Sequence, residues 1–545
     1  MSGCISQTDG VTPAAAEAVL NRSVDWTDAT HGNKVDPDYS VVFPEDSVNT
    51  MTITLSPKEW QMMLDDMTNL CGTFGGSTGG DMNRGMGGGG GGDFDYDTVY
   101  VGADITFDGK TWTDVGIRFK GQSTLTRTWQ SGSYKLSFKL NFDKFEEENS
   151  DIKNQRFYGF DELNLKSGMG DDSLLKDLII PKVFNDAGVV APATAFYRVY
   201  LDYGDGPVYF GVYTMIESVE DTLIETRFAD DSGNIYKPEG TGATFASGTF
   251  DISAFEKKTN EDDEDYSDVE RLYTVLNSEL RTNNPAAWRE ELIRTFDVNT
   301  FINWLAVTTI IENWDVYGNQ CKNFYLYTDP STGQIIWIPW DHNEALPSGG
   351  GVTSGGDRMI QGGQRDTRDA GEAPVMGPRG DSDEVPPFMN AGERTPMDTT
   401  MFGQRNVPGS QTEGEMPMIG GIENRGGGMG RSLSLGLTEV GDNWPLIRYL
   451  MDDPVYYAQY LDALDATVLD FFEPTKMAEL YRYYHNLISP YVIGANGEVD
   501  GYTNLNSQAN FEASLEQLID YTNNRQIAVI EFLTTRRGAE GKEVV

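Results

Sequence analysis

The sequence has few cysteines and few histidines, and this scarcity disfavours several kinds of site. Its 545 residues include three cysteines and three histidines. No two cysteines have the spacing of a metal site, and an odd number is a poor disulfide framework. A zinc centre or a histidine-based catalytic triad is therefore disfavoured. The cysteines are Cys4, Cys71 and Cys321, and the histidines are His31, His342 and His485.

Basic residues are scarce beside acidic ones. The chain carries 41 Lys and Arg residues against 85 Asp and Glu residues, a formal net charge of −44. A surface of that sign repels phosphate backbones and anionic lipids, which argues against nucleic acid as a partner. A nucleotide would have to be attracted by a local basic pocket together with a cation.

A long apolar run is missing as well. No stretch of about 20 apolar residues, the length that spans a bilayer, occurs in the sequence. The N-terminal Ser2-Gly3-Cys4 resembles the end of a bacterial lipobox, whose cysteine is lipidated after signal cleavage. The apolar segment expected before it is absent. Either Cys4 tethers the protein to a membrane or the match is a coincidence, and the polar residues that follow favour the tether.

The composition divides the chain into parts. Hydrophobic residues make up 39% of it, which is enough for a substantial core. We expect an N-terminal tether at 1–38, a folded core at 39–347 and a helical continuation of that core at 437–545. Two Gly- and Met-rich stretches, 73–93 and 348–436, read as disordered insertions. The longer one could be a substrate lid with autophosphorylation sites or an inert linker.

The stretch between residues 309 and 346 holds the strongest chemical signal. An apolar helix end is followed by a polar loop that carries Asp315, then by Asn323. Two aromatic and β-branched runs, separated by an Asp-Pro-Ser-Thr-Gly turn, predict a β-hairpin. Asp341 follows the second run. The hairpin should therefore hold Asn323 and Asp341 near the same end, with Asp315 on the loop before them.

Three oxygen ligands that converge in this way suit a hard cation such as Mg²⁺ or Mn²⁺. The order acid, amide, hairpin, acid is also the order that protein kinases use for phosphoryl transfer, where the first acid accepts the hydroxyl proton. Asp315 is then the candidate base, and Asn323 and Asp341 are candidate metal ligands. The alternative is that both acids are a helix cap and a turn residue.

Residues 97–140 read as antiparallel strands with an Asp-Gly turn. Gly121 and Ser123 follow one of these strands, and small residues there could direct backbone N–H groups at a phosphate, although an ordinary turn is as good an explanation. Arg118, on the strand before the turn, is a further candidate phosphate contact. A later hairpin ends at Glu217, where a nucleotide ribose or a lysine could be bound. Apolar helical stripes dominate the C-terminal quarter, so the fold class is α+β.

Several separated motifs together resemble the CotH family of spore-coat and surface protein kinases. They are NWDVYGNQCKNFYLY with IPWDHNEAL, VGIRFKGQSTL, SYKLSFKLNF, FYGFDELNLKSGMGDDSLLKD and GVYTMIESVE. The resemblance implies an atypical bilobal protein-kinase-like fold, with a β-rich N-lobe and a helical C-lobe. It also implies an enzyme that uses ATP and Mg²⁺ to phosphorylate Ser and Thr.

Within those motifs, the resemblance points to Lys135 as the strand lysine that holds the ATP phosphates, with Lys139 as the second choice. The interval from Asp315 to Asn323 is longer than in the kinase catalytic loop, so Asn319 is an alternative amide ligand. Cys321 should pack beside this loop, and His342 should be solvated.

The sequence thus favours a Ser/Thr protein kinase outside the cell or on its surface, acting on proteins with Ser/Thr-rich segments. Two alternatives remain: a non-catalytic adhesin or coat scaffold that keeps the fold, and a kinase of small molecules or glycans.

Overall fold

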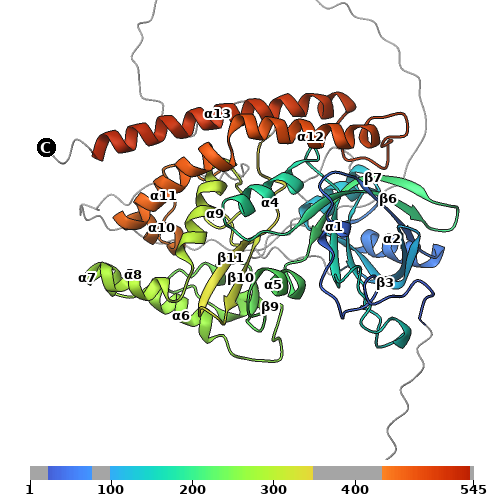
Figure 1. Ribbon diagram of the computed structural model, residues 1–545, viewed down its shortest axis with the longest axis horizontal. Coiled ribbons are helices and arrows are strands. Elements are labelled where there is room, and N and C mark those ends of the chain that lie inside the picture. The colour runs from blue at the N-terminus through green and yellow to red at the C-terminus, as the bar shows by residue number, and fades with distance from the viewer. Residues whose placement is uncertain (1–21, 77–97, 348–431, 541–545) are drawn as a thin grey trace, which may run out of the picture. The chain divides into compact units, whose positions relative to one another are not determined.

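The computed structural model describes residues 22–76, 98–347 and 432–540, which belong to one compact unit. The described chain is of mixed α and β structure, so the predicted α+β class is confirmed (Figure 1). Residues 348–431, most of the longer Gly-rich insertion, lie outside the described residues, as do 77–97 and Cys4. Among the described residues, no helix combines the length and the apolar character needed to cross a membrane.

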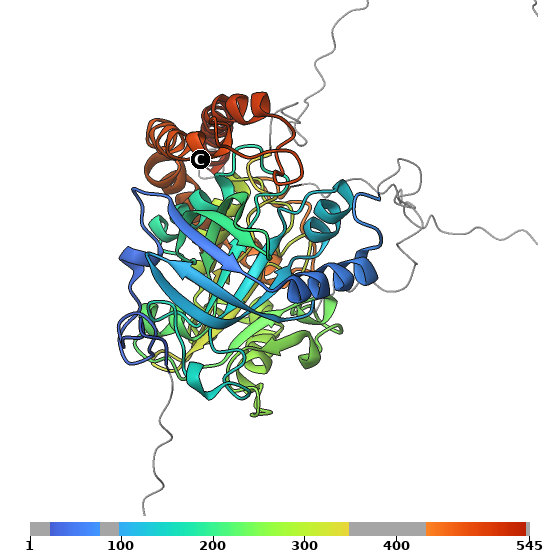
Figure 2. The ribbon, with the colours of Figure 1, turned by 90° about the vertical axis from the view of Figure 1, so that its right-hand side faces the viewer.

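Seven strands close into a barrel, which occupies the N-terminal half of the unit (Figure 2). Its order is β1-β2-β3-β4-β5-β7-β6, and it is closed by parallel pairing of β1 with β6. The strands are β1 (Asn49–Thr54), β2 (Val101–Phe107), β3 (Lys110–Lys120), β4 (Ser137–Asn141), β5 (Glu162–Lys166), β6 (Thr194–Asp202) and β7 (Val208–Glu217).

Apolar and polar side chains alternate along the barrel strands, so one face of each strand is buried and the other points outward. Every second side chain of β2 is buried, and β4 likewise buries Phe138 and Leu140 while Ser137 and Lys139 face outward. The inward side chains form one apolar cluster, and the outward face of β3, β4 and β5 is polar. The expected bilobal kinase-like arrangement is not established, because these strands form a closed barrel.

A second sheet and most helices lie beside the barrel (Figure 1). Their buried side chains form a separate apolar cluster. The sheet has the order β11-β10-β8-β9 and consists of β8 (Ile235–Pro238), β9 (Phe255–Lys257), β10 (Phe324–Asp329) and β11 (Gln334–Pro339). The longer helices around it are α4 (Lys176–Asp186), α9 (Val298–Ile310), α11 (Pro454–Ala466), α12 (Pro474–Val492) and α13 (Gln508–Glu540). The C-terminal helices therefore complete the core that begins before the longer insertion.

The remaining α-helices lie around the two sheets. Next to the barrel are α1 (Tyr39–Val42), α2 (Pro57–Cys71), α3 (Ser123–Ser131) and α5 (Asp221–Arg227), and beside the second sheet are α6 (Ser267–Leu276), α7 (Leu280–Asn283), α8 (Pro285–Ile293) and α10 (Pro445–Asp452). Helix α2 begins at Pro57, because Ser56 and Glu59 form a reciprocal capping box and proline is favoured in the first turn.

The predicted tether is wrong for its described part, residues 22–38. The His31 ring stacks on Trp112 with centroids 4.3 Å apart, and the backbone N–H of Asp38 donates to Tyr158 O at 2.9 Å. Buried aromatic stacking of this kind fixes the segment against the barrel. The rest of the predicted tether, residues 1–21, lies outside the described residues.

Lys135 does not belong to the outward face of its strand. Strand β4 begins only at Ser137, so the alternation that would expose Lys135 does not reach it. Its ammonium is fully buried and lies 2.5 Å from Glu498 Oε1, which also accepts the backbone N–H of Val212. Burial lowers the pKa of Lys135, against the pull of Glu498. The lysine therefore ties the barrel to the segment between α12 and α13.

Replacing Lys135 tests this structural role. We expect Lys135→Met to lower the free energy of unfolding by about 3–5 kcal/mol, because Glu498 would stay buried without its counter-charge. Urea denaturation measures the change. The exposed Lys58→Met is the control and should shift stability by less than about 0.5 kcal/mol. A Lys135→Met protein of unchanged stability that fails to bind ATP would restore the lysine to the phosphate site.

Candidate active site

The open end of the β10–β11 hairpin brings an amide and a carboxylate together. Phe324 pairs with Pro339, and the backbone N–H of Trp340 donates to Asn323 O at 3.0 Å. Asn323 lies directly before β10, and Asp341 lies two residues after β11. Both residues are therefore at the same end of the hairpin, as the sequence predicts. Both have left-handed backbones, with φ of +62° and +54°. Asn and Asp tolerate this conformation best among non-glycine residues, and such strained positions cluster at functional sites.

Asp315 joins them from the loop after α9. Asn323 Nδ2 donates to Asp315 O at 2.8 Å and to Asp315 Oδ2 at 3.1 Å. Lys322 Nζ lies 3.2 Å from Asp315 Oδ1, but no hydrogen bond of good geometry reaches this buried oxygen within the described residues. Burial raises the pKa of Asp315 despite Lys322, and the nearby Asp341 charge adds to the rise.

The C-terminal helix α13 holds the start of this loop. Helix α9 ends at Ile310, and its last carbonyl groups lack partners within the helix. Tyr521 Oη donates to Ile310 O at 2.7 Å, and Arg525 donates to Thr309 O at 2.6 Å. The loop that carries Asp315 thus depends on residues about 200 positions later in the chain.

Asp341 is held by Lys166, a residue that the sequence reasoning missed. Lys166 Nζ lies 2.7 Å from Asp341 Oδ1, and the Asp341 side chain keeps 28% exposure. Burial alone would raise the pKa of Asp341, but Lys166, His342 and Lys120 outweigh it and lower that pKa. Asp341 is therefore a charged carboxylate at neutral pH. Lys166 lies within the quoted motif FYGFDELNLKSGMGDDSLLKD and is the last residue of β5, and this position was the available signal.

A polar stripe on the outer face of the barrel leads to Asp341. Register pairs Arg118 with Lys139, and Lys139 with Asn164, so these three share one face. Lys120 and Lys166 lie two residues further along the same face. Lys120 Nζ is 2.5 Å from Asn164 Oδ1 and 4.8 Å from the centre of the Trp340 ring.

Two of the predicted phosphate contacts lie on this stripe, at some remove from Asp341. Lys139 Nζ is 2.5 Å from Glu162 and 3.6 Å from Glu220, and Arg118 lies over the Tyr100 ring. Their role as nucleotide contacts stays a prediction. They lie on the same outer face of the barrel as Lys166.

Helix α4 adds an acid to the cluster, near the buried His342. The buried Asp177 carboxylate, in its first turn, lies near the His342 backbone. Burial, opposed by Lys166, raises the pKa of Asp177 to about 6. His342 is not solvated as expected: it is buried beside Phe184, and burial lowers its pKa to about 3.

The turn at Gly121 leads into α3, which lies near the loops that carry Asp315 and Asp341. Gly121 has φ of +119°, which favours glycine, and α3 begins two residues later at the exposed Ser123. Arg127 of α3 lies 3.8 Å from Glu344, which also accepts Trp314 Nε1–H at 3.1 Å. The predicted turn after a strand is present, and phosphate binding there stays a prediction.

Two other predicted residues lie elsewhere. Glu217 is fully buried, accepting hydrogen bonds from Tyr39 Oη and from Ala193 N–H, so it is packed inside the protein and cannot reach a ribose. Asn319 is half-buried in the turn after Asp315, but the amide that bonds Asp315 is Asn323. Cys321 is buried beside the loop, as expected, and burial raises the pKa of its thiol.

The cluster suits a cation that also binds phosphate. Asp315, Asn323 and Asp341 supply oxygen ligands, and both Asn323 hydrogen bonds use Nδ2, which leaves Oδ1 for coordination. Among the described residues, no three His, Cys, Asp or Glu side chains form a metal cage. Mg²⁺ commonly needs no more than one or two carboxylates, with phosphate and water completing its shell. The charged Asp341 carboxylate, whose side chain keeps 28% exposure, fits such an ion.

Together these features describe a mixed α and β protein with an acid- and lysine-lined site suited to a divalent cation and a polyphosphate. A family model described as CotH kinase protein matches residues 117–375 and 417–529, more than half of the chain. The chain belongs to this CotH kinase family.

A curated relative agrees with the family. The Inner spore coat protein H of Bacillus subtilis (strain 168) is 24% identical over 238 residues. The match covers 42% of this chain and 58% of that protein, so this chain spans less than two thirds of the relative's length.

The raised pKa of Asp177 predicts a pH dependence of stability. In the unfolded chain the pKa of this carboxyl is near its ordinary value of 3.8, whereas in the folded protein its pKa of about 6 keeps the proton bound up to about pH 6. The folded state therefore binds the extra proton within this window, and stability falls as pH rises through it. Asp177→Asn removes the ionisation, so we expect its stability relative to wild type to increase by roughly 1–3 kcal/mol from about pH 4 to about pH 7.

Urea denaturation at the two pH values, without divalent cations, measures this difference. The matched control is Asp262→Asn, in an exposed acidic loop, which should show the same stability difference at both pH values. A constant difference for Asp177→Asn would contradict the raised pKa.

Proposed function

We propose that the protein is an ATP- and Mg²⁺-dependent phosphotransferase that phosphorylates Ser and Thr hydroxyls of proteins outside the cell or on its surface. One observation carries the proposal: Asp315, Asn323 and Asp341 converge at the hairpin end, beside Lys166 and Lys322. Membership of the CotH kinase family supports the same reaction.

The acids have separate roles in this proposal. Asp341 and Asn323 hold the cation, because both lie at the fixed hairpin end and Asp341 keeps its charge. A bound Mg²⁺ or Mn²⁺ neutralises the phosphates and orients them for transfer. Asp315 serves as the base. Its raised pKa brings it closer to the working pH, which favours proton acceptance.

In the transfer itself, the acceptor hydroxyl oxygen forms a bond to the γ-phosphorus, and the bond from that phosphorus to the oxygen of the departing ADP breaks. The hydroxyl proton passes to an Asp315 carboxylate oxygen. Asn323 holds Asp315 through its backbone and side-chain oxygens, which keeps the carboxylate oriented.

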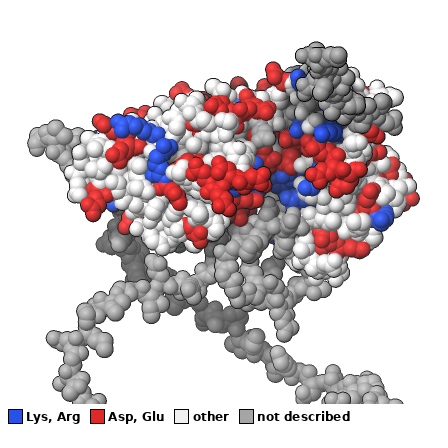
Figure 3. All heavy atoms as spheres, turned by 90° about the horizontal axis from the view of Figure 1, so that it is seen from below, with Lys and Arg blue, Asp and Glu red and all other residues white. Residues whose placement is uncertain are grey.

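The lysines near Asp315 and Asp341 provide local positive charge on a protein whose surface is mainly acidic. In Figure 3, acidic side chains cover much more of the visible face than basic ones do. The formal charge of −44 repels ATP at a distance, so attraction must be local. Lys166, Lys120 and Lys322 are the nearest cations to the two acids, and they replace Lys135 as our candidates for phosphate contacts.

A second candidate function is a structural role in a coat, with or without catalysis. The observation that favours it is the name of the relative, an inner spore coat protein. A scaffold alone would not need Asp315, Asn323 and Asp341 held together by two strained backbones. The phosphotransferase is therefore preferred, with glycans or small molecules as alternative acceptors.

Removal of the Asp341 carboxylate tests the proposal. We expect Asp341→Ala to reduce transfer of label from γ-labelled ATP, with Mg²⁺ or Mn²⁺ and a Ser/Thr-rich protein acceptor, by about 100-fold or more. Asp262→Asn, which changes the same charge on an exposed loop, should transfer label normally. A wild-type protein that binds ATP without transferring label would favour the scaffold.

Lys166 and a cation compete for the same carboxylate. We expect Lys166→Met to bind Mn²⁺ several-fold more tightly than wild type in the absence of nucleotide, because Asp341 loses its internal counter-charge. The same variant should bind ATP about tenfold more weakly, since a phosphate loses a charged hydrogen bond. Isothermal titration calorimetry measures both constants, with Lys58→Met as control. Weaker Mn²⁺ binding by Lys166→Met would argue against Asp341 as a metal ligand.

A further inference from the structure

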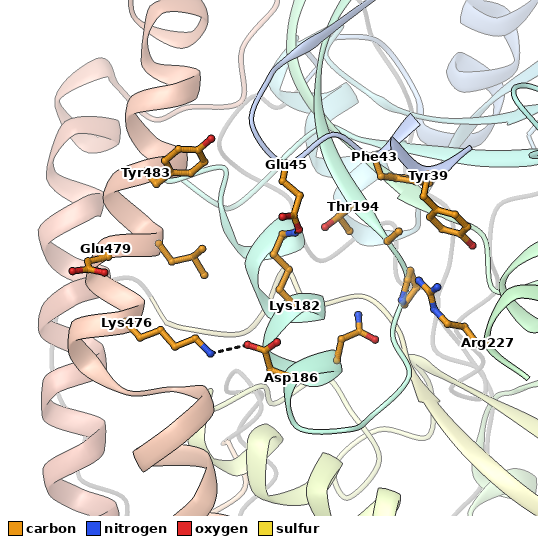
Figure 4. A pocket seen from close by; sticks show the side chains of 14 residues that line it. Tyr39, Phe43, Glu45, Lys182, Asp186, Thr194, Arg227, Lys476, Glu479 and Tyr483 are labelled. Carbon is orange, nitrogen blue, oxygen red and sulfur yellow. Dashed lines mark hydrogen bonds and ion pairs between the residues drawn. The ribbon is translucent and has the colours of Figure 1, made fainter. Parts of the chain in front are cut away.

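A cavity separate from the candidate active site lies between the barrel and the helices, and no residue named in that site lines it. Its volume is about 810 Å³, within the range of small-molecule pockets. Its described walls come from the α1 segment, the second half of α4, the start of β6, the end of α5 and one side of α12 (Figure 4). Five separate parts of the chain thus meet around one space.

The walls combine apolar and aromatic surface. Phe43, Pro192 and Leu480 line the cavity together with Tyr39 and Tyr483. The Tyr483 side chain is 46% exposed, a large value for an aromatic residue next to a cavity. An apolar ring bound here would cover this surface and gain the free energy of its removal from water.

Most charges around the cavity are already paired. Lys182 lies 2.7 Å from Glu45, and Lys476 lies 2.8 Å from Asp186. Arg227 is different, because its guanidinium stacks over the Tyr39 ring at 5.1 Å and forms no ion pair within the described part of the chain. This exposed cation could bind a carboxylate, sulfonate or phosphate group directly.

The wall beside Arg227 is rigid. Tyr39 Oη donates to the buried Glu217 carboxylate, and Ala193 N–H donates to its other oxygen at 2.9 Å. These hydrogen bonds fix the ring under Arg227 and the backbone of the neighbouring wall before any ligand arrives. A preorganised wall reduces the entropy lost on binding.

The opposite wall carries an acid. Figure 4 places Glu479 on α12, across the cavity from Arg227. The negative charge there should weaken the binding of an anion slightly, and its removal should not harm such binding. Removal of the Arg227 charge and removal of the Glu479 charge should therefore have different effects on an anion bound at Arg227. A dye that adheres to any apolar surface should not distinguish the two changes.

We propose that this cavity is a second ligand site, which binds an organic anion with a flat apolar body. The anionic group lies at Arg227, and the apolar body lies against Phe43, Leu480 and Tyr483. The site shares α4 with the candidate active site, because Lys182, Asn185 and Asp186 line the cavity while Asp177 contacts the His342 backbone. The proposal does not rest on the proposed function.

The test uses 8-anilinonaphthalene-1-sulfonate, a fluorescent aromatic sulfonate, with the full chain. We expect saturable one-to-one binding to wild type and about tenfold weaker binding to Arg227→Gln, the loss expected for one charged hydrogen bond. Glu479→Gln should bind at least as tightly as wild type. Arg482→Gln removes an exposed arginine of α12 that does not line the cavity, and it should bind as wild type does.

Hydrogen exchange locates the bound dye. Backbone amides of α4 should exchange more slowly when the dye is bound, because three of its side chains line the cavity. Thermal denaturation checks that each variant is folded. Equal affinity of wild type and Arg227→Gln, equal losses in Arg227→Gln and Arg482→Gln, or no added protection of α4 would each overturn the proposal.

Discussion

The pairing of β10 with β11 is the constraint on which the candidate active site depends. The last backbone hydrogen bond of the ladder joins Trp340 to Asn323, so the residues on either side of it have little freedom. Asn323 then reaches back to Asp315, and Asp341 meets Lys166 from the barrel. A change of register by one residue would turn the side chains of one strand of the hairpin to the opposite face of the sheet.

This geometry also influences the pKa values of Asp315 and Asp341. Each of the two central acids faces a lysine, Asp315 with Lys322 and Asp341 with Lys166. The outcome differs because burial dominates at Asp315 and raises its pKa, whereas neighbouring cations dominate at Asp341 and lower its pKa. Two carboxylates in one site thus acquire different proton affinities, which is how one of them can act as a base while the other stays charged.

Barrel closure determines which side chains can meet these acids. The parallel contact of β1 with β6 leaves no open edge between these strands, and the inner face is filled with apolar residues. Polar residues of β3, β4 and β5 are consequently confined to the outer face, which ends at Asp341. The same separation explains the role of Lys135, which lies outside the alternating strand and is neutralised in the interior by Glu498.

Much of the local structure could be predicted from the sequence. The capping box at Ser56, the hairpin around the Asp-Pro-Ser-Thr-Gly turn and the strand periodicity all depend on neighbours within a few residues. The positions of Asn323 and Asp341 at one hairpin end follow from that local pairing. The family could also be recognised, because its motifs are contiguous stretches of chain.

The sequence by itself therefore determined the elements, the hairpin end and the family. The tertiary structure decided which lysine faces which acid: Lys166 rather than Lys135 meets Asp341, Asp177 of α4 approaches from a distant segment, and His342 is buried. Closure of the barrel and the cavity beside Arg227 also depend on the tertiary structure. The physical reason is that periodicity specifies a face of an element, whereas the partner of that face depends on pairing between distant segments.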